Sequence, residues 1–222
     1  MDNGTHGWLI HKRQVGETGL WLTLFSREQG LLRARLRGRS LAKKNAFFQV
    51  FTPLWWHLDE REYGIYVRDM DVSAMSLALE GSNLLAGLYL NELLAHLLAL
   101  NQIEEQVFDA YEQALYALVG CRESTTLERI LRRFEWELLL ACGVLVSFTH
   151  ASDSQLPLNA ALYYQFSPTE GFRGASSGYL GRDILAIADL KFEESSVLRT
   201  AKRVMPHRSE SPSSLSHSCV SV

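Results

Sequence analysis

The stretch that decides the fold is residues 31–45, LLRARLRGRSLAKKN, which carries six cations and no acid. The cations are Arg33, Arg35, Arg37, Arg39, Lys43 and Lys44. In the first half, arginines alternate with apolar residues, and successive side chains of a β-strand point to opposite faces of the sheet. The alternation therefore predicts a strand with three guanidinium groups on one face and aliphatic side chains on the other. Gly38 and Ser40 end the pattern, so the two lysines are expected on a loop.

This basic stretch has two interpretations. A row of cations that continues onto a basic loop suits a ligand whose negative charges repeat along a line, and nucleic acid is such a ligand. The alternative is a solvated edge strand, because charges on a sheet edge prevent pairing with strands of other molecules. An edge strand seldom carries this many cations without an acid, so nucleic acid and a solvated edge are both open on the pattern alone.

The composition of the 222 residues is that of a globular protein, with 47% hydrophobic and 21% charged residues, and it allows one or two domains. No run reaches the roughly 18 apolar residues of a membrane span, so no membrane association is expected. The three cysteines, Cys121, Cys142 and Cys219, are widely spaced. They predict neither a disulfide framework nor a structural zinc site, and they favour a cytoplasmic location.

The basic surface is local. Residues 1–75 hold 11 Lys and Arg against 8 Asp and Glu, whereas residues 76–222 hold 11 against 17. Only the first part of the chain is therefore a plausible face for nucleic acid.

Five short strands are expected in the first 75 residues, at 7–14, 20–26, the basic stretch, 47–58 and 63–72, with turn signals between them. Pro53 demotes the middle of the fourth strand to an edge or a bulge. Five short strands without a helical period predict a small closed or half-closed barrel, of which the OB-fold is one example.

Beyond residue 75 the period becomes helical. The helix at 82–100 is apolar nearly all round and is expected to be buried, with Ser82 as N-cap. Further helices are expected at 104–119 and 125–142, the latter between Ser124 and Gly143 as caps. These helices are followed by a hairpin at 159–172, a helix after Gly178 and a last helix at 194–204.

The predicted fold class is therefore α+β, an N-terminal OB-fold barrel followed by a mainly α-helical domain. We expect the barrel at 1–75 and the helical domain at 76–205, with a small irregular region near 143–178. Residues 206–222 are rich in serine and lack periodicity, so they are expected to be disordered.

Catalytic signals are lacking in the sequence. It contains no phosphate-binding loop, no dinucleotide fingerprint and no zinc-protease motif. The seven histidines never occur as pairs at metal-ligand spacing, and acid pairs such as those at 104–105 and 193–194 lie at helix starts, where they favour the helix dipole. We therefore expect a binding protein without catalytic residues, cofactor or metal.

A second candidate binding site lies on two of the predicted helices. Its cations stand beside apolar positions and are Arg132, Arg199, Lys202 and Arg203. Cations next to a hydrophobic groove suit an acidic peptide with an aromatic end. The alternative is a solvated helix face with intrahelical pairs, for example Arg132 with Glu128 or Glu135.

Five segments carry a likeness to a known family, LFSREQG at 24–30, FTPL at 51–54, LAGLYLNELL at 85–94, LRRFE at 131–135 and LRTAKR at 198–203. In their content and order they resemble the RecO family of bacterial recombination mediators and DNA-repair proteins. The segment at 85–94 is the most specific of these, and the resemblance extends from Trp8 to Arg203.

The resemblance implies an N-terminal OB-fold, a helical domain and a non-enzymatic role in recombination on the nucleoid. RecO-like proteins bind single- and double-stranded DNA, anneal complementary strands and bind the acidic C-terminal tail of single-strand-binding protein (SSB). Together with RecR they help to load RecA onto SSB-coated strands. Two departures stand out. The four-cysteine zinc site of some members is absent between Gly143 and Ser177, and the serine-rich end replaces a basic tail, as in a truncated or frame-shifted chain.

We therefore hypothesise that the basic strand and loop follow phosphates, and that Trp21 or Trp55 either stacks bases or belongs to the core. The alternative is an interaction adaptor, in which the OB-like barrel binds protein and the arginines serve solubility. An adaptor would bind a partner without annealing strands.

Overall fold

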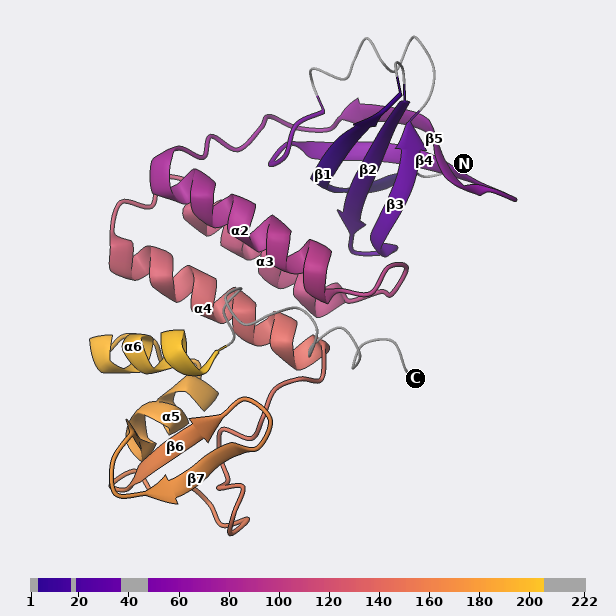
Figure 1. The fold of residues 1–222 in the computed structure, drawn as a ribbon. Helices are drawn as coiled ribbons and strands as arrows, with labels where there is room; N and C mark the ends of the chain where they lie inside the picture. The colour runs from indigo at the N-terminus through magenta and orange to yellow at the C-terminus, as the bar shows by residue number, and fades with distance from the viewer. Residues whose placement is uncertain (1–3, 17–18, 37–47, 206–222) are drawn as a thin grey trace. The chain divides into compact units, whose positions relative to one another are not determined.

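The structure, a computed structural model, describes residues 4–16, 19–36 and 48–205. The chain divides into two compact units, Met1–Cys121 and Arg122–Val222. The first unit contains a barrel followed by two long helices, and the second contains a long helix, a small sheet and two short helices (Figure 1). Each unit is described below by itself. Within the described ranges, no helix combines the length and the apolar character needed to cross a bilayer.

Five strands form the closed barrel of the first unit. They are β1 (Thr5–Val15), β2 (Gly19–Ser26), β3 (Gly30–Leu36), β4 (Pro53–Arg61) and β5 (Gly64–Val72). Their order around the barrel is β1-β2-β3-β5-β4, and β4 closes on β1. β3 and β5 pair in parallel, whereas the other neighbours are antiparallel. The predicted five-stranded, OB-like barrel is confirmed.

Apolar side chains at alternate positions of β2 and β3 fill the interior of the barrel. Leu22 and Leu24 of β2 and Ala34 and Leu36 of β3 are buried in one hydrophobic cluster. The fourth strand differs from the prediction because it begins at Pro53 and not at residue 47. Proline has no amide hydrogen for a sheet ladder, so the first position of a strand accommodates it.

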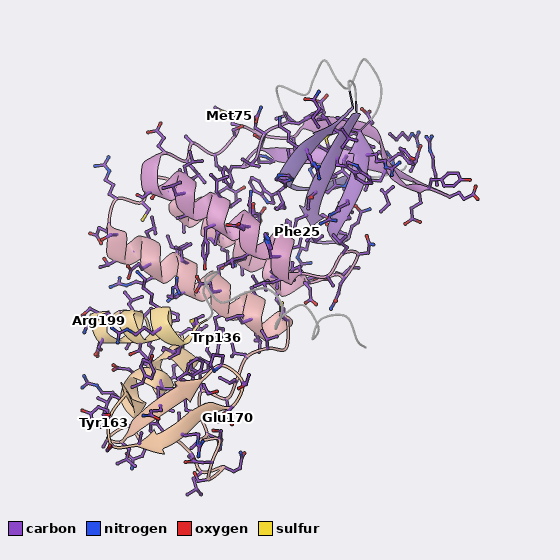
Figure 2. All side chains as sticks on the ribbon, in the orientation of Figure 1. Phe25, Met75, Trp136, Tyr163, Glu170 and Arg199 are labelled. Atoms are coloured by element: carbon purple, nitrogen blue, oxygen red, sulfur yellow. The ribbon has the colours of Figure 1, made fainter. Side chains whose placement is uncertain are left out.

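Two helices pack on the barrel within the first unit, α2 (Gly81–Leu97) and α3 (Glu105–Leu118). The Asn91 side-chain amide donates to the Ile10 carbonyl of β1 at 3.1 Å, and the Tyr111 hydroxyl donates to the Asn91 carbonyl oxygen at 2.6 Å. Burial raises the pKa of Tyr111, which keeps this hydroxyl protonated as a donor. Phe25 of β2, which is labelled in Figure 2, lies in edge contact with Phe108 of α3, with ring centroids 5.3 Å apart.

The turn between β2 and β3 contacts the segment between these helices. Gly30 has a φ of +67°, and a Cβ there would lie 1.9 Å from the Gln102 carbonyl oxygen. The Asn101 amide donates to the Leu31 carbonyl at 2.7 Å. Arg27 forms an ion pair with Glu105 at 2.7 Å. The barrel and the two helices therefore form one compact unit.

Two expectations for α2 are wrong. The helix begins at Gly81, and Glu80, which precedes it, makes no side-chain capping bond, so Ser82 is not the N-cap. The helix is also not buried all round, because Leu84, Leu85 and Leu88 are exposed. Its buried face is the one that meets β1 and α3, and one face suffices to hold a helix in place.

The second unit begins with α4 (Ser124–Ala141) and continues with β6 (Tyr163–Ser167), β7 (Gly171–Ala175), β8 (Tyr179–Leu180), α5 (Gly181–Ala188) and α6 (Ser195–Val204). The sheet order is β7-β6-β8, and β6 and β7 form the expected hairpin, which spans 163–175 and not 159–172. Ser124 is the first helical residue and not the cap, a position that Glu123 occupies. Gly143 has a φ of +65° just after the helix, as a C-terminal glycine should.

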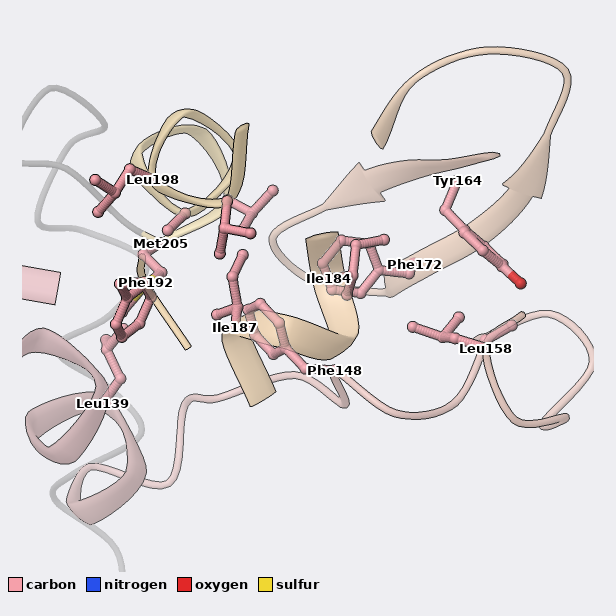
Figure 3. Close-up of a cluster of buried hydrophobic side chains, with 14 residues drawn as sticks. Leu139, Phe148, Leu158, Tyr164, Phe172, Ile184, Ile187, Phe192, Leu198 and Met205 are labelled. Atoms are coloured by element: carbon pink, nitrogen blue, oxygen red, sulfur yellow. The ribbon is translucent and has the colours of Figure 1, made fainter. Parts of the chain in front are cut away.

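The core of the second unit joins all of these elements. Figure 3 shows Leu139 of α4, Phe172 of β7, Ile184 and Ile187 of α5 and Leu198 of α6 in one buried cluster. Arg129 of α4 donates to the carbonyl oxygens of residues 192 and 193, at 3.1 Å each, and so fixes the segment that leads into α6.

Two expectations from the sequence stay predictions. One is the domain boundary near residue 75. The other is the disorder of residues 206–222, which lie outside the described residues.

Candidate nucleic-acid interface

The outer face of β1, β2 and β3 carries the predicted row of cations. None of these three strands contains an aspartate or a glutamate. On β3, Arg33 is exposed and Arg35 is half-buried, whereas the aliphatic residues between and beside them are buried. The predicted alternation of arginines outside and apolar groups inside is therefore confirmed over the described part of the strand.

Strand register extends this face across the barrel. Arg13 of β1 pairs with Trp21 of β2, Trp21 pairs with Arg35 of β3, and Arg35 pairs with Tyr66 of β5. Side chains at directly paired positions lie on the same face of a sheet. Arg13, Trp21, Arg35 and Tyr66 thus form one row, beside the row of His11, Thr23 and Arg33. We call these two rows the arginine face.

The arginine face contains stacked cations and rings. The Arg35 guanidinium carbon lies 4.4 Å from the ring centroid of Trp21 and 5.9 Å from that of Tyr66. Arg61 lies 5.1 Å from the centroid of Tyr66 and also forms an ion pair with Asp59 at 3.1 Å. Cation–π contacts of this kind stabilise exposed sites by about 0.5–1 kcal/mol each. They hold Arg35 in one place.

Not every cation near this face belongs to it. Lys12 lies between His11 and Arg13 in β1, so its side chain points to the opposite face of the strand. Its Nζ donates to the Phe48 carbonyl at 2.9 Å. Burial lowers the pKa of Lys12. Four predicted contact residues, Arg37, Arg39, Lys43 and Lys44, lie outside the described residues. Their role as DNA contacts stays a prediction.

The two tryptophans that were considered for base stacking have different neighbours. Trp21 lies between Arg13 and Arg35. Trp55 of β4 lies between His6 and Asp71 and meets His57 edge-on, with ring centroids 6.0 Å apart. Both side chains are partly exposed on the barrel, but only the surroundings of Trp21 suit a polyanion.

Sequence reasoning missed four members of the face, which are His11, Arg13, Thr23 and Tyr66. Arg13 carried a usable signal, because it lies in a predicted strand that precedes a tight turn, which brings it opposite Trp21. Tyr66 carried none, because it reaches Arg35 only through the parallel closure of β3 on β5.

The four cations of the second candidate site differ in their exposure to solvent. Arg132 is buried and forms an ion pair with Glu135 at 2.7 Å, which is one of the pairings considered as the alternative. The two atoms are close, but their geometry is not that of a hydrogen bond. Arg199, Lys202 and Arg203 are exposed on α6, and Figure 2 labels Arg199 there. Only these three present their charges to solvent.

Comparison with known proteins identifies the chain's relatives. Residues 1–67 match the family model "Recombination protein O N terminal", and residues 79–185 match "Recombination protein O C terminal". The DNA repair protein RecO of Legionella pneumophila (strain Corby) is 39% identical over 201 residues, which cover 90% of this chain and 88% of that protein. The chain belongs to the RecO family. The DNA repair protein RecO of Yersinia pestis (strain Pestoides F) is 32% identical over 209 residues, which cover 91% of this chain and 86% of the relative.

The family assignment confirms the resemblance seen in the sequence and fits the observed OB-like barrel. As for metals, no group of three or more His, Cys, Asp or Glu able to hold an ion occurs among residues 4–16, 19–36 and 48–205 of this RecO-family chain. Cys121 and Cys142 form no disulfide bond with another described residue.

Proposed function

We propose that this RecO-family chain is a non-enzymatic DNA-repair protein that binds single- and double-stranded DNA on the arginine face. The observation that carries the proposal is that outward arginines of β1 and β3 flank β2 on a face whose three strands contain no acid. A DNA-repair role is also what the printed names of its relatives state. Such a role would place the protein on the nucleoid in the cytoplasm.

The arginine face would bind DNA through phosphates and without reading sequence. Arg33 is exposed and can reach a phosphate, and Arg13 offers a second cation on β1, which is separated from β3 by β2. The predicted contacts Arg37, Arg39, Lys43 and Lys44 would extend the track beyond β3. Neutralising phosphates on one strand reduces its repulsion toward a complementary strand, which is the physical basis that we propose for annealing.

Binding of the SSB tail is proposed for α6. Three exposed cations on one short helix, Arg199, Lys202 and Arg203, suit the carboxylates of an acidic peptide. Arg132 would contribute only if its pair with Glu135 opened, so Arg199 is the better residue to test. Contact with RecR and loading of RecA on SSB-coated strands complete the proposed role, and both rest on the family assignment.

The DNA proposal is tested by fluorescence anisotropy of a labelled single strand over a range of salt concentrations. If three to five phosphates are neutralised, log K falls against log salt with a slope of roughly −2 to −3.5. Changing Arg33, Arg35 and Arg37 to Ala should weaken binding and flatten the slope. The matched control changes three exposed arginines of the second unit, Arg133, Arg173 and Arg182, to Ala, which alters the net charge equally.

The results separate the candidates. Equal weakening in both triple variants would show that net charge and not the arginine face governs binding. A slope near zero would remove the electrostatic argument. Partner binding without DNA binding or annealing would favour the adaptor.

The proposed tail site on α6 is tested separately. Arg199→Glu should weaken binding of an acidic peptide with an aromatic end, whereas Arg173→Glu should not. Equal affinities for the peptide would reject the site on α6.

A further inference from the structure

The two described arginines of β3 differ in their surroundings. Arg33 is exposed and pairs across the strands with Thr23. Arg35 is half-buried, lies over the Trp21 ring, and its Nε atom is buried without a hydrogen-bond partner among the described residues. A buried donor without a partner costs free energy. Arg35 is thus held in place with unused donor capacity.

A pocket opens beside this pair. Its volume is about 170 Å³, and its lining consists of Val15, Gly19, Leu20, Trp21, Arg35 and Leu36. The lining is mostly apolar, with one indole ring and one guanidinium group. A phosphate would lose its hydration here and meet a single cation, which is unfavourable. A flat group with apolar faces and polar acceptors at its edge matches the pocket better.

An unpaired nucleobase is such a group. Its face can stack on an aromatic ring, and its carbonyl oxygens or ring nitrogens can accept hydrogen bonds from arginine. Within a duplex both faces of a base are covered by its neighbours, so a paired base cannot enter the pocket. A site of this kind would therefore select single strands.

We propose that Trp21 and Arg35 form a stacking subsite for one unpaired nucleobase, while Arg33 contacts the phosphate backbone beside it. This inference rests on the proposed DNA-binding function. It adds that different residues of the arginine face contact the base and the phosphate backbone. Its ligand is single-stranded nucleic acid, recognised by a base and not by charge alone. Trp55, with Asp71 as its cross-strand neighbour, takes no part.

The experiment compares two labelled strands of equal length, a deoxythymidine 15-mer and a fully abasic 15-mer. Both carry the same phosphates, but only the first carries bases. Trp21→Leu should weaken binding of the thymidine strand by roughly 5- to 150-fold, the range seen when an aromatic stacking partner is removed. The same change should leave the affinity for the abasic strand and the salt slope unaltered. Trp55→Leu, the matched control, should alter neither affinity.

Two outcomes overturn the subsite alone. They are equal weakening of both strands by Trp21→Leu, and no weakening of either while the wild-type protein still binds DNA. Wild-type protein that binds neither strand would overturn the proposed function as well, so the two failures are distinguishable. Should Trp21→Leu fail to fold, as judged by circular dichroism, Trp21→Phe replaces it. The thymidine strand should then quench the fluorescence of the wild type more than that of the variant, and equal quenching would reject the subsite.

Discussion

β3 and α4 both place arginines next to apolar residues, and both were predicted to contact a ligand. On β3 the two described arginines face outward over a barrel surface without acids on three strands. On α4 Arg132 is buried and is paired with Glu135. The same residue type in a similar sequence context is therefore turned outward in one element and buried in the other.

The period of each element explains the difference. A strand sends alternate residues to opposite faces, so an arginine between leucines points away from the core by geometry. A helix with a wide apolar stripe can include a charged residue at its border, and here Arg132 shares the buried side with Glu135 and Leu139. Burial of this arginine is tolerated because its partner is buried beside it.

The largest effect that we expect from this comparison is on stability. Arg132→Ala leaves the Glu135 carboxylate buried without its partner, so the free energy of unfolding should fall by about 3–5 kcal/mol. Chemical denaturation followed by circular dichroism measures the change. Arg33→Ala on β3 is the matched control and should change the free energy of unfolding by less than about 0.5 kcal/mol.

A double substitution sharpens the same point. Arg132→Met combined with Glu135→Leu replaces the pair by apolar groups of similar volume, which is often neutral or stabilising. We expect it to recover most of the stability lost in Arg132→Ala. A double variant as unstable as the single one would mean that the ion pair and not its packing holds α4 in place.

A smaller effect is expected from changing arginine to lysine within β3. Arg33→Lys keeps a charge at an exposed position, so the affinity for a single strand and the salt slope should be nearly unchanged. Arg35→Lys removes the planar guanidinium group that would contact a base beside Trp21, and loss of a contact of about 0.5–1 kcal/mol to the ligand corresponds to roughly a two- to fivefold weaker affinity. Anisotropy titrations measure both variants. Equal weakening would mean that the two arginines act alike.

The smallest effect concerns α6. Arg199 is exposed, and its guanidinium group donates to the Ser195 hydroxyl at 3.4 Å. Arg199→Ala should therefore change the free energy of unfolding by less than about 0.5 kcal/mol. Thermal or chemical denaturation tests this directly. A loss comparable to that of Arg132→Ala would show that Arg199 is part of the fold and would argue against a free binding surface on α6.

Sequence alone was sufficient for features that depend on local period. The alternation in β3 predicted which side chains face out, and the helical spacing after residue 75 predicted α3, α4 and α6 to within about two residues. Gly143 marked the end of α4 because a left-handed position after a helix favours glycine. In each case the signal and the structure that it specifies lie within one short segment, so neighbouring elements are not needed.

Tertiary structure decided what depends on segments distant in the sequence. Tyr66 joins the arginine face because β5 pairs in parallel with β3, some 30 residues earlier, and no local pattern specifies that pairing. The same holds for Arg132, whose burial follows from how α4 packs, and for Trp21 and Trp55, which the sequence left equivalent. Residue period sets the direction of a side chain, but only the packing of whole elements sets what that side chain meets.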